Sequence, residues 1–93
     1  MEPNKVQIKV DDSVVGGAYA NVMQVSHSKE EFIMDFVSLY PPLGKLVARV
    51  ITSPGHMKRI VKALEENLAR YEKEVGKIEI AEEPKSDFGF DTK

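Results

Sequence analysis

Residues 31–52, EFIMDFVSLYPPLGKLVARVIT, decide the fold because they hold two apolar stretches separated by a proline-rich break. Residues 31–40 are the strongest strand candidate in the chain, and their apolar side chains fall on both faces of such a strand. Residues 45–52 are β-branched and apolar, which favours another strand. Residues 41–44, PPLG, end the first strand, because proline cannot continue a central ladder. The stretch therefore predicts an antiparallel pair of strands.

Two further strand candidates precede this pair. Residues 5–10, KVQIKV, alternate apolar and polar side chains with the period of a strand that has one solvated face. Residues 18–27, AYANVMQVSH, are rich in β-forming residues and contain neither proline nor glycine. Residues 28–30 form a polar break of the length of a hairpin turn. We therefore expect an antiparallel meander of three or four strands.

One long helix follows the predicted strands. Ser53 is a natural N-cap and Pro54 suits the first helical position, and no breaker follows before Gly76. About 22 helical residues would be near 33 Å long. We expect the helix to pack on the sheet, and we favour this over a coiled coil. The fold class is therefore α+β, and the apolar stripe of the helix consists of Met57, Val61, Leu64, Leu68, Tyr71 and Val75.

The domain organisation follows from the same pattern. Residues 1–76 are expected to form a single α+β domain, and residues 77–93 a short edge strand at Ile78 and Ile80 followed by a mobile tail. The 93 residues include no cysteine, which excludes disulfide frameworks and zinc fingers. The N-terminal residues MEPNKVQIKV lack the features of a signal peptide, so we expect a cytoplasmic protein without a membrane partner.

Between about residues 5 and 76 the chain resembles a family of small, uncharacterised bacterial and archaeal proteins, a domain of unknown function. The resemblance implies no activity, ligand or catalytic residue. It rests on Tyr19-Ala20-Asn21, Val25-Ser26-His27-Ser28, Glu31-Phe32, Asp35-Phe36, Arg49-Val50-Ile51, Ser53-Pro54-Gly55-His56, Lys58-Arg59, Ala63-Leu64, Asn67 and Tyr71-Glu72.

The apolar strand at residues 31–40 also predicts self-association. A strand that is apolar on both faces needs cover on both, whereas a single helix covers one face of the sheet. A second copy of the chain is the simplest source of the other cover, so we expect a homodimer. The alternative is that the N-terminal strand and the C-terminal tail fold over that face.

Three polar residues within the predicted sheet have a structural interpretation. Asp35 and Arg49 lie in the two paired strands, and a register that places them on one face would let them form an ion pair. Asn21 on the neighbouring strand would then satisfy the hydrogen-bonding capacity that the pair leaves over. We expect these residues to fix the register of the sheet.

The start of the helix is the candidate binding site. Helix N-termini attract anions and normally carry acidic residues, but the first three turns here are basic. An anion site would explain this, whereas the alternative is a solvated face with tolerated charge. The chain has no phosphate-binding loop of the nucleotide hydrolases. The site would combine backbone N–H groups of Ser53 and Gly55 with the side chains of His56, Lys58, Arg59 and Lys62.

A catalytic alternative uses His27 with Glu31 or Asp35, but no spacing typical of a metal or catalytic site supports it. We expect no catalytic residues, no metal and no cofactor. The favoured function is a non-enzymatic cytoplasmic binding or adaptor module that holds phosphate groups or a nucleic-acid backbone at the helix start. The alternative is a homo-oligomeric protein-interaction module that acts through sheet edges and the acidic tail.

Overall fold

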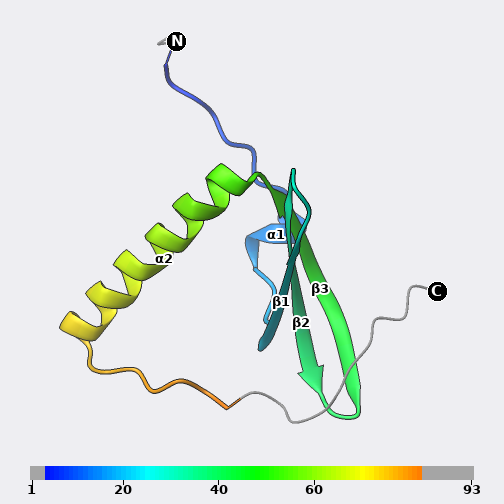
Figure 1. Ribbon diagram of the computed structural model, residues 1–93, viewed down its shortest axis with the longest axis vertical. Coiled ribbons are helices and arrows are strands. Elements are labelled where there is room, and N and C mark those ends of the chain that lie inside the picture. The colour runs from blue at the N-terminus through cyan, green and yellow to red at the C-terminus, as the bar shows by residue number, and fades with distance from the viewer. Residues whose placement is uncertain (1–3, 83–93) are drawn as a thin grey trace.

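The computed structural model describes residues 4–82, which form one antiparallel sheet followed by a long helix (Figure 1). The strand order β1-β2-β3 follows the chain, so the sheet is a meander. This confirms the α+β class and settles the number of strands at three within the described residues. The elements are α1 (Asp12–Val15), β1 (Val22–His27), β2 (Phe32–Tyr40), β3 (Leu43–Thr52) and α2 (Pro54–Glu74).

The strand predicted at residues 5–10 is wrong. These residues form no ladder, and Val6 and Ile8 are more than three-quarters exposed. Alternation of apolar and polar side chains is a local signal, whereas a strand also needs a neighbouring edge to satisfy its backbone groups. The chain instead turns into the single-turn helix α1, and β1 begins at Val22 rather than at residue 18.

The hairpin between β2 and β3 is tighter than the sequence indicates. Pro41 and Pro42 alone form the turn, with a cis peptide bond between them, and Tyr40 pairs with Leu43. Leu43 and Gly44 therefore belong to β3 rather than to the break. A register shift between Phe36 and Val37 accommodates one extra residue in β3.

The sheet has an apolar face toward the start of α2, here called the inner face. Side chains alternate along a strand, so Phe32, Met34 and Phe36 share this face with Val25 of β1 and Val50 of β3. Phe32 and Met57 of α2 line the same hollow, which identifies this face as the one toward the helix.

Few side chains are buried anywhere in the described chain. The buried apolar residues are Met34, Val37 and Leu39, each at most 8% exposed, and all belong to β2. Because β2 is the central strand, its neighbours cover it on both sides. The sheet therefore has a core of a single strand, which is small for a domain of this length.

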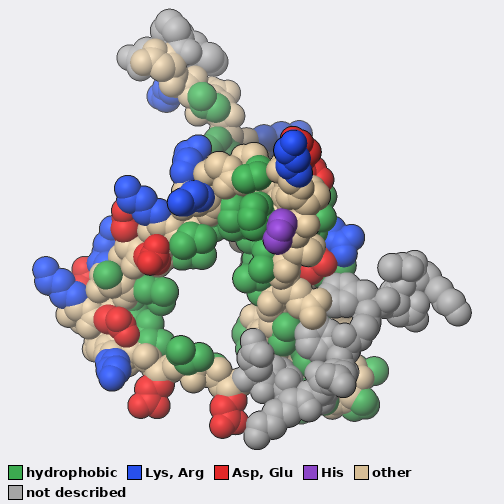
Figure 2. Space-filling model, in the orientation of Figure 1, with side chains coloured by type: hydrophobic (Ala, Val, Ile, Leu, Met, Phe, Trp, Pro, Cys, Tyr) green, Lys and Arg blue, Asp and Glu red, His purple; other side chains and the backbone are tan. Residues whose placement is uncertain are grey.

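The helix α2 forms as predicted but does not pack on the sheet. Its 21 residues extend about 32 Å from the corner of the sheet. Leu64 and Leu68 in its apolar stripe remain 59% and 53% exposed. Figure 2 shows an opening between α2 and the sheet that persists when all side chains are drawn. The expected packing of α2 on the sheet is therefore not seen, and Ser53 is the single residue that joins β3 to α2.

Residues 77–82 follow α2 as an extended segment without a strand partner, so the predicted edge strand at Ile78 and Ile80 is also wrong. Ile80 is 97% exposed, and the backbone N–H of Ile78 donates to Glu72 Oε2 over 3.0 Å. The predicted tail beyond Glu82 lies outside the described residues. No helix in residues 4–82 is long and apolar enough to cross a membrane.

Candidate functional site

The start of α2 is capped as the sequence predicts. Ser53 Oγ accepts the backbone N–H of His56 over 3.2 Å, and the Ser53 carbonyl accepts that of Met57 over 2.9 Å. Pro54 has no N–H, so Gly55 is left with the free N–H of this turn. Ser53 thus acts mainly through acceptor atoms, and an anion here would depend on side-chain charge more than the sequence indicates.

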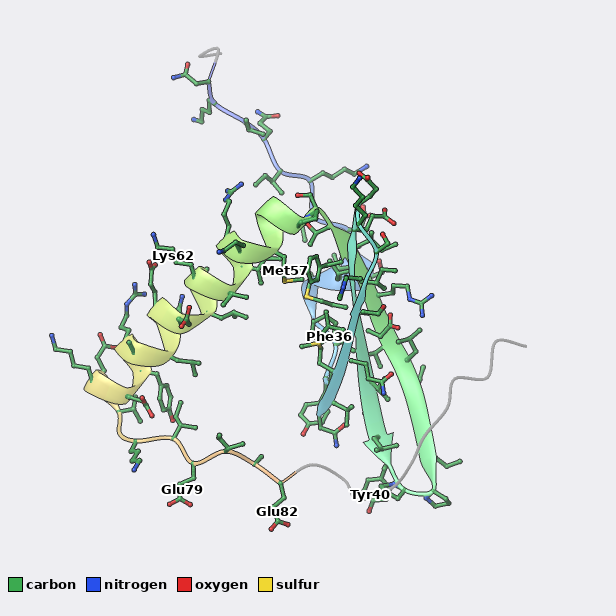
Figure 3. The ribbon with its side chains drawn as sticks, in the orientation of Figure 1. Phe36, Tyr40, Met57, Lys62, Glu79 and Glu82 are labelled. Carbon is green, nitrogen blue, oxygen red and sulfur yellow. The ribbon has the colours of Figure 1, made fainter. Side chains whose placement is uncertain are left out.

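That charge comes from Lys58, Arg59 and Lys62, here called the basic surface. All three are exposed, and the first turn of α2 contains no acidic residue. Within residues 4–82 the structure contains one ion pair, which involves other residues, although Glu65 lies close enough to line the same hollow as these cations. Lys and Arg side chains gather over this end of the helix in Figure 2, and Lys62 points away from the sheet in Figure 3.

An open hollow of 500 Å³ lies where the basic surface meets the sheet. Phe32, Met57 and Val61 supply apolar side chains to it, and Met57 lies on the side of α2 that faces the sheet (Figure 3). Phe32 is also close to His27, with ring centroids 5.3 Å apart and a 31° tilt between the rings. An aromatic pair therefore lies beside the hollow, while Lys58, Arg59, Lys62 and Glu65 complete its lining.

The second histidine of the sequence prediction, His56, is exposed in the first turn of α2. It lies on the same side of the helix as Arg59, three residues later, whereas Lys58 is two residues later and lies on the opposite side, so α2 does not gather the six predicted residues on one face. Its backbone N–H is committed to the Ser53 cap. Its ring is therefore the part that remains available to a ligand.

The structure places two residues of the catalytic alternative, His27 and Asp35, on opposite faces of the sheet. His27 pairs with Phe32 and belongs to the inner face, whereas Asp35 lies on the opposite face. Ser28 closes the β1–β2 turn, because its Oγ accepts the backbone N–H groups of Glu30 and Glu31 over 3.2 and 3.3 Å. Across residues 4–82 no three side chains of the metal-binding types gather as a metal site would require.

Asp35 and Arg49 form the predicted ion pair across β2 and β3. Arg49 donates from Nε to Oδ1 over 2.6 Å and from Nη2 to Oδ2 over 2.9 Å, a bidentate arrangement. The hydrogen bonds and charge of Arg49 lower the pKa of the Asp35 carboxyl, although desolvation acts in the opposite sense. The Asp35 side chain is 14% exposed and that of Arg49 52%, so the pair lies at the surface of the outer face.

Asn21 has a different partner from the one predicted. Its side chain does not contact the ion pair; it bonds to the backbone of Leu39 at the far end of β2. The sequence prediction missed this because Asn21 precedes β1 instead of lying within it, which places it beside Leu39. The amide of an asparagine can donate and accept hydrogen bonds, which is why the sequence predicts a structural role for Asn21. The β1–β2 register is what shows that its partner is Leu39.

Sequence reasoning also missed the aromatic pair beside the basic surface. The signal was present, because a hairpin with its turn at residues 28–31 places His27 opposite Phe32. The exposed inner face was missed for another reason: the helix was expected to cover it.

Comparison with known proteins supports the resemblance at the level of the family. A family model described as "Protein of unknown function (DUF3467)" matches residues 1–80. No curated protein and no solved structure matches the chain.

Proposed function

We propose that this chain, which belongs to the DUF3467 family of proteins of unknown function, is a binding module that holds the phosphate groups of a nucleic-acid backbone on its basic surface. In this proposal the protein is not an enzyme, and it acts in the cytoplasm, where a chain without cysteine needs no oxidising environment. Phosphate contacts of this kind position a protein on nucleic acid without reading its sequence.

The observation that carries the proposal is the group of cations at the start of α2. Lys58, Arg59 and Lys62 form no ion pair within residues 4–82, and they follow the capped first turn of α2. The chain as a whole has a net charge of −2, so this positive surface is local.

The hollow beside the basic surface favours a nucleic acid over a free phosphate ion. Phe32 and His27 offer aromatic rings next to the cations, and single strands combine backbone phosphates with bases that stack on such rings. An isolated phosphate would use the cations but gain nothing from the apolar lining.

The test is the affinity for a short fluorescent single-stranded oligonucleotide, measured by anisotropy at about 50 and 200 mM salt. The variant Lys58→Gln/Arg59→Gln/Lys62→Gln should bind at least about tenfold more weakly, because it removes three phosphate contacts. Its matched control, Arg70→Gln/Lys73→Gln/Lys77→Gln, removes the same charge from the other end of the helical region. Equal losses in the two variants, or no binding by the unmodified protein at low salt, would refute the proposal.

A second candidate function rests on the edges of the sheet. β1 and β3 are both edge strands, and most of their residues are exposed. Such edges accept an added strand from a partner protein. A protein-interaction module that combined these edges with the acidic C-terminal segment would lose its partner on deletion of residues 77–93. It would also show weak dependence on salt.

A further inference from the structure

The stripe of α2 and the inner face of the sheet are two apolar surfaces that lack a partner. Val61, Leu64 and Leu68 are 47–59% exposed, and Val25 and Val50 of the sheet are 53% and 42% exposed. Hydrophobic side chains line both sides of the opening in Figure 2. Contiguous apolar surfaces of this kind are rare on monomeric soluble proteins and mark interaction sites.

The exposed area of the chain is large enough for a stable interface. A compact monomer of this mass exposes about 5,400 Å², whereas this chain exposes 8926 Å². Its radius of gyration is 16.6 Å, against about 12 Å for a compact chain of this length. Residues outside the strands and helices account for part of the excess. A standard interface buries roughly 800 Å² of the surface of each partner, which is a small part of this excess.

The junction between β3 and α2 is short, and the helix leaves the sheet there without covering it. Thr52 ends β3 and Pro54 begins α2, so Ser53 alone would have to absorb the change of direction. Pro54 has a fixed φ, and the cap bonds from His56 and Met57 to Ser53 hold the first turn in place.

We propose that a second copy of the chain fills the opening, with the α2 stripe of each copy packed on the inner face of the other. Each copy has an exposed apolar helix stripe and an exposed apolar sheet face. A two-fold arrangement in which each stripe packs on the other copy's sheet would bury both surfaces in both copies. The charged pair Asp35–Arg49 lies on the outer face and is not buried by this contact.

The exchange of helices shares Phe32 with the ligand site proposed above, because Phe32 belongs to the inner face and also lines the hollow beside the basic surface. Lys62 points away from the sheet (Figure 3), although it lines the hollow beside Phe32 together with the other two residues of the basic surface. The pair would carry two copies of it. The two proposals are still tested separately, because sedimentation reports dimerisation whereas fluorescence anisotropy reports oligonucleotide binding.

The first test uses the unmodified protein at micromolar concentration. Sedimentation velocity should give twice the 10.4 kDa mass of the chain. In a mixture of labelled and unlabelled copies, isotope-filtered NMR should show contacts between the methyl groups of Leu64 or Leu68 and the ring of Phe36 in a different molecule. A monomer, or contacts found only within one molecule, would overturn the proposal.

A second test places a charge in the proposed contact. Leu68→Asp should weaken the dimer at least about 100-fold, because an unpaired carboxylate would enter an apolar interface. The control is the adjacent substitution Ala69→Asp, which lies about 100° away around the helix and should leave the dimer intact. Equal weakening by both, or by neither, would contradict the exchange. If a different protein covers these surfaces, the purified chain will sediment as a monomer.

Discussion

Asn21 and Leu39 exchange two hydrogen bonds although 18 residues separate them. Asn21 Nδ2 donates to the Leu39 carbonyl over 2.9 Å, and the Leu39 N–H donates to Asn21 Oδ1 over 2.8 Å. The side-chain amide thus takes the place of a peptide group next to β1. It satisfies backbone groups of a buried residue at the point where the β1–β2 ladder ends.

We predict that Asn21→Ala lowers the free energy of unfolding by about 1–2 kcal/mol, because it leaves two backbone groups of Leu39 without partners. Urea unfolding followed by circular dichroism measures the change. Asn67→Ala is the matched control, since the Asn67 side chain donates only to Ala63 within α2 and alanine favours helix. A loss for Asn67→Ala as large as that for Asn21→Ala would contradict the role of the Asn21 bonds.

The ion pair between Asp35 and Arg49 predicts a dependence of stability on pH. The pKa of Asp35 is lowered from its ordinary value of 3.8 in the folded chain, so the pair contributes fully above that pH. The contribution is lost as the pH falls below 3.8 and through the lower folded value. We expect the coupling in a double-mutant cycle with Asp35→Asn and Arg49→Gln to disappear at acidic pH. Coupling of equal size at about pH 7 and at about pH 2 would exclude this ion pair as its source.

The Ser53 side chain should contribute more to the free energy of unfolding than an exposed serine that caps no helix. Ser53→Ala removes the acceptor for the His56 N–H and is expected to lower the free energy of unfolding by about 1 kcal/mol. Thermal or urea unfolding with and without the substitution measures this. Ser26→Ala in β1 is the control, because Ser26 is exposed and belongs to no helix terminus. If Ser53→Ala lowers the free energy of unfolding no more than Ser26→Ala does, the Ser53 cap does not stabilise the start of α2 as described.

The elements that the sequence predicts correctly have strong local signals. The helix has a cap, a proline and a repeated apolar spacing, and the hairpin has two β-branched stretches around Pro41 and Pro42. Residues 5–10 have the alternation of a strand but no available edge, so the same local signal fails there. Pairing depends on the rest of the chain, and alternation alone does not report it.

The parts of the candidate site that depend on local sequence signals were also predictable. The ion pair of Asp35 with Arg49 follows from the hairpin register, and the basic surface follows from consecutive positions on one helix. The partner of Asn21 and the exposed stripe of α2 depend on where distant segments lie. A single residue joins β3 to α2. The apolar periodicity of α2 does not indicate the direction in which the helix leaves the sheet.

The most direct test of the proposed function is a titration of ¹⁵N-labelled protein with short mixed-sequence RNA and DNA oligonucleotides, followed by backbone amide shifts at low and moderate salt. The account predicts shifts concentrated in residues 53–62 that fade as salt rises, because phosphate contacts depend on released counterions. No shifts at low salt, or shifts along β1 and β3 instead, would contradict binding at the start of α2.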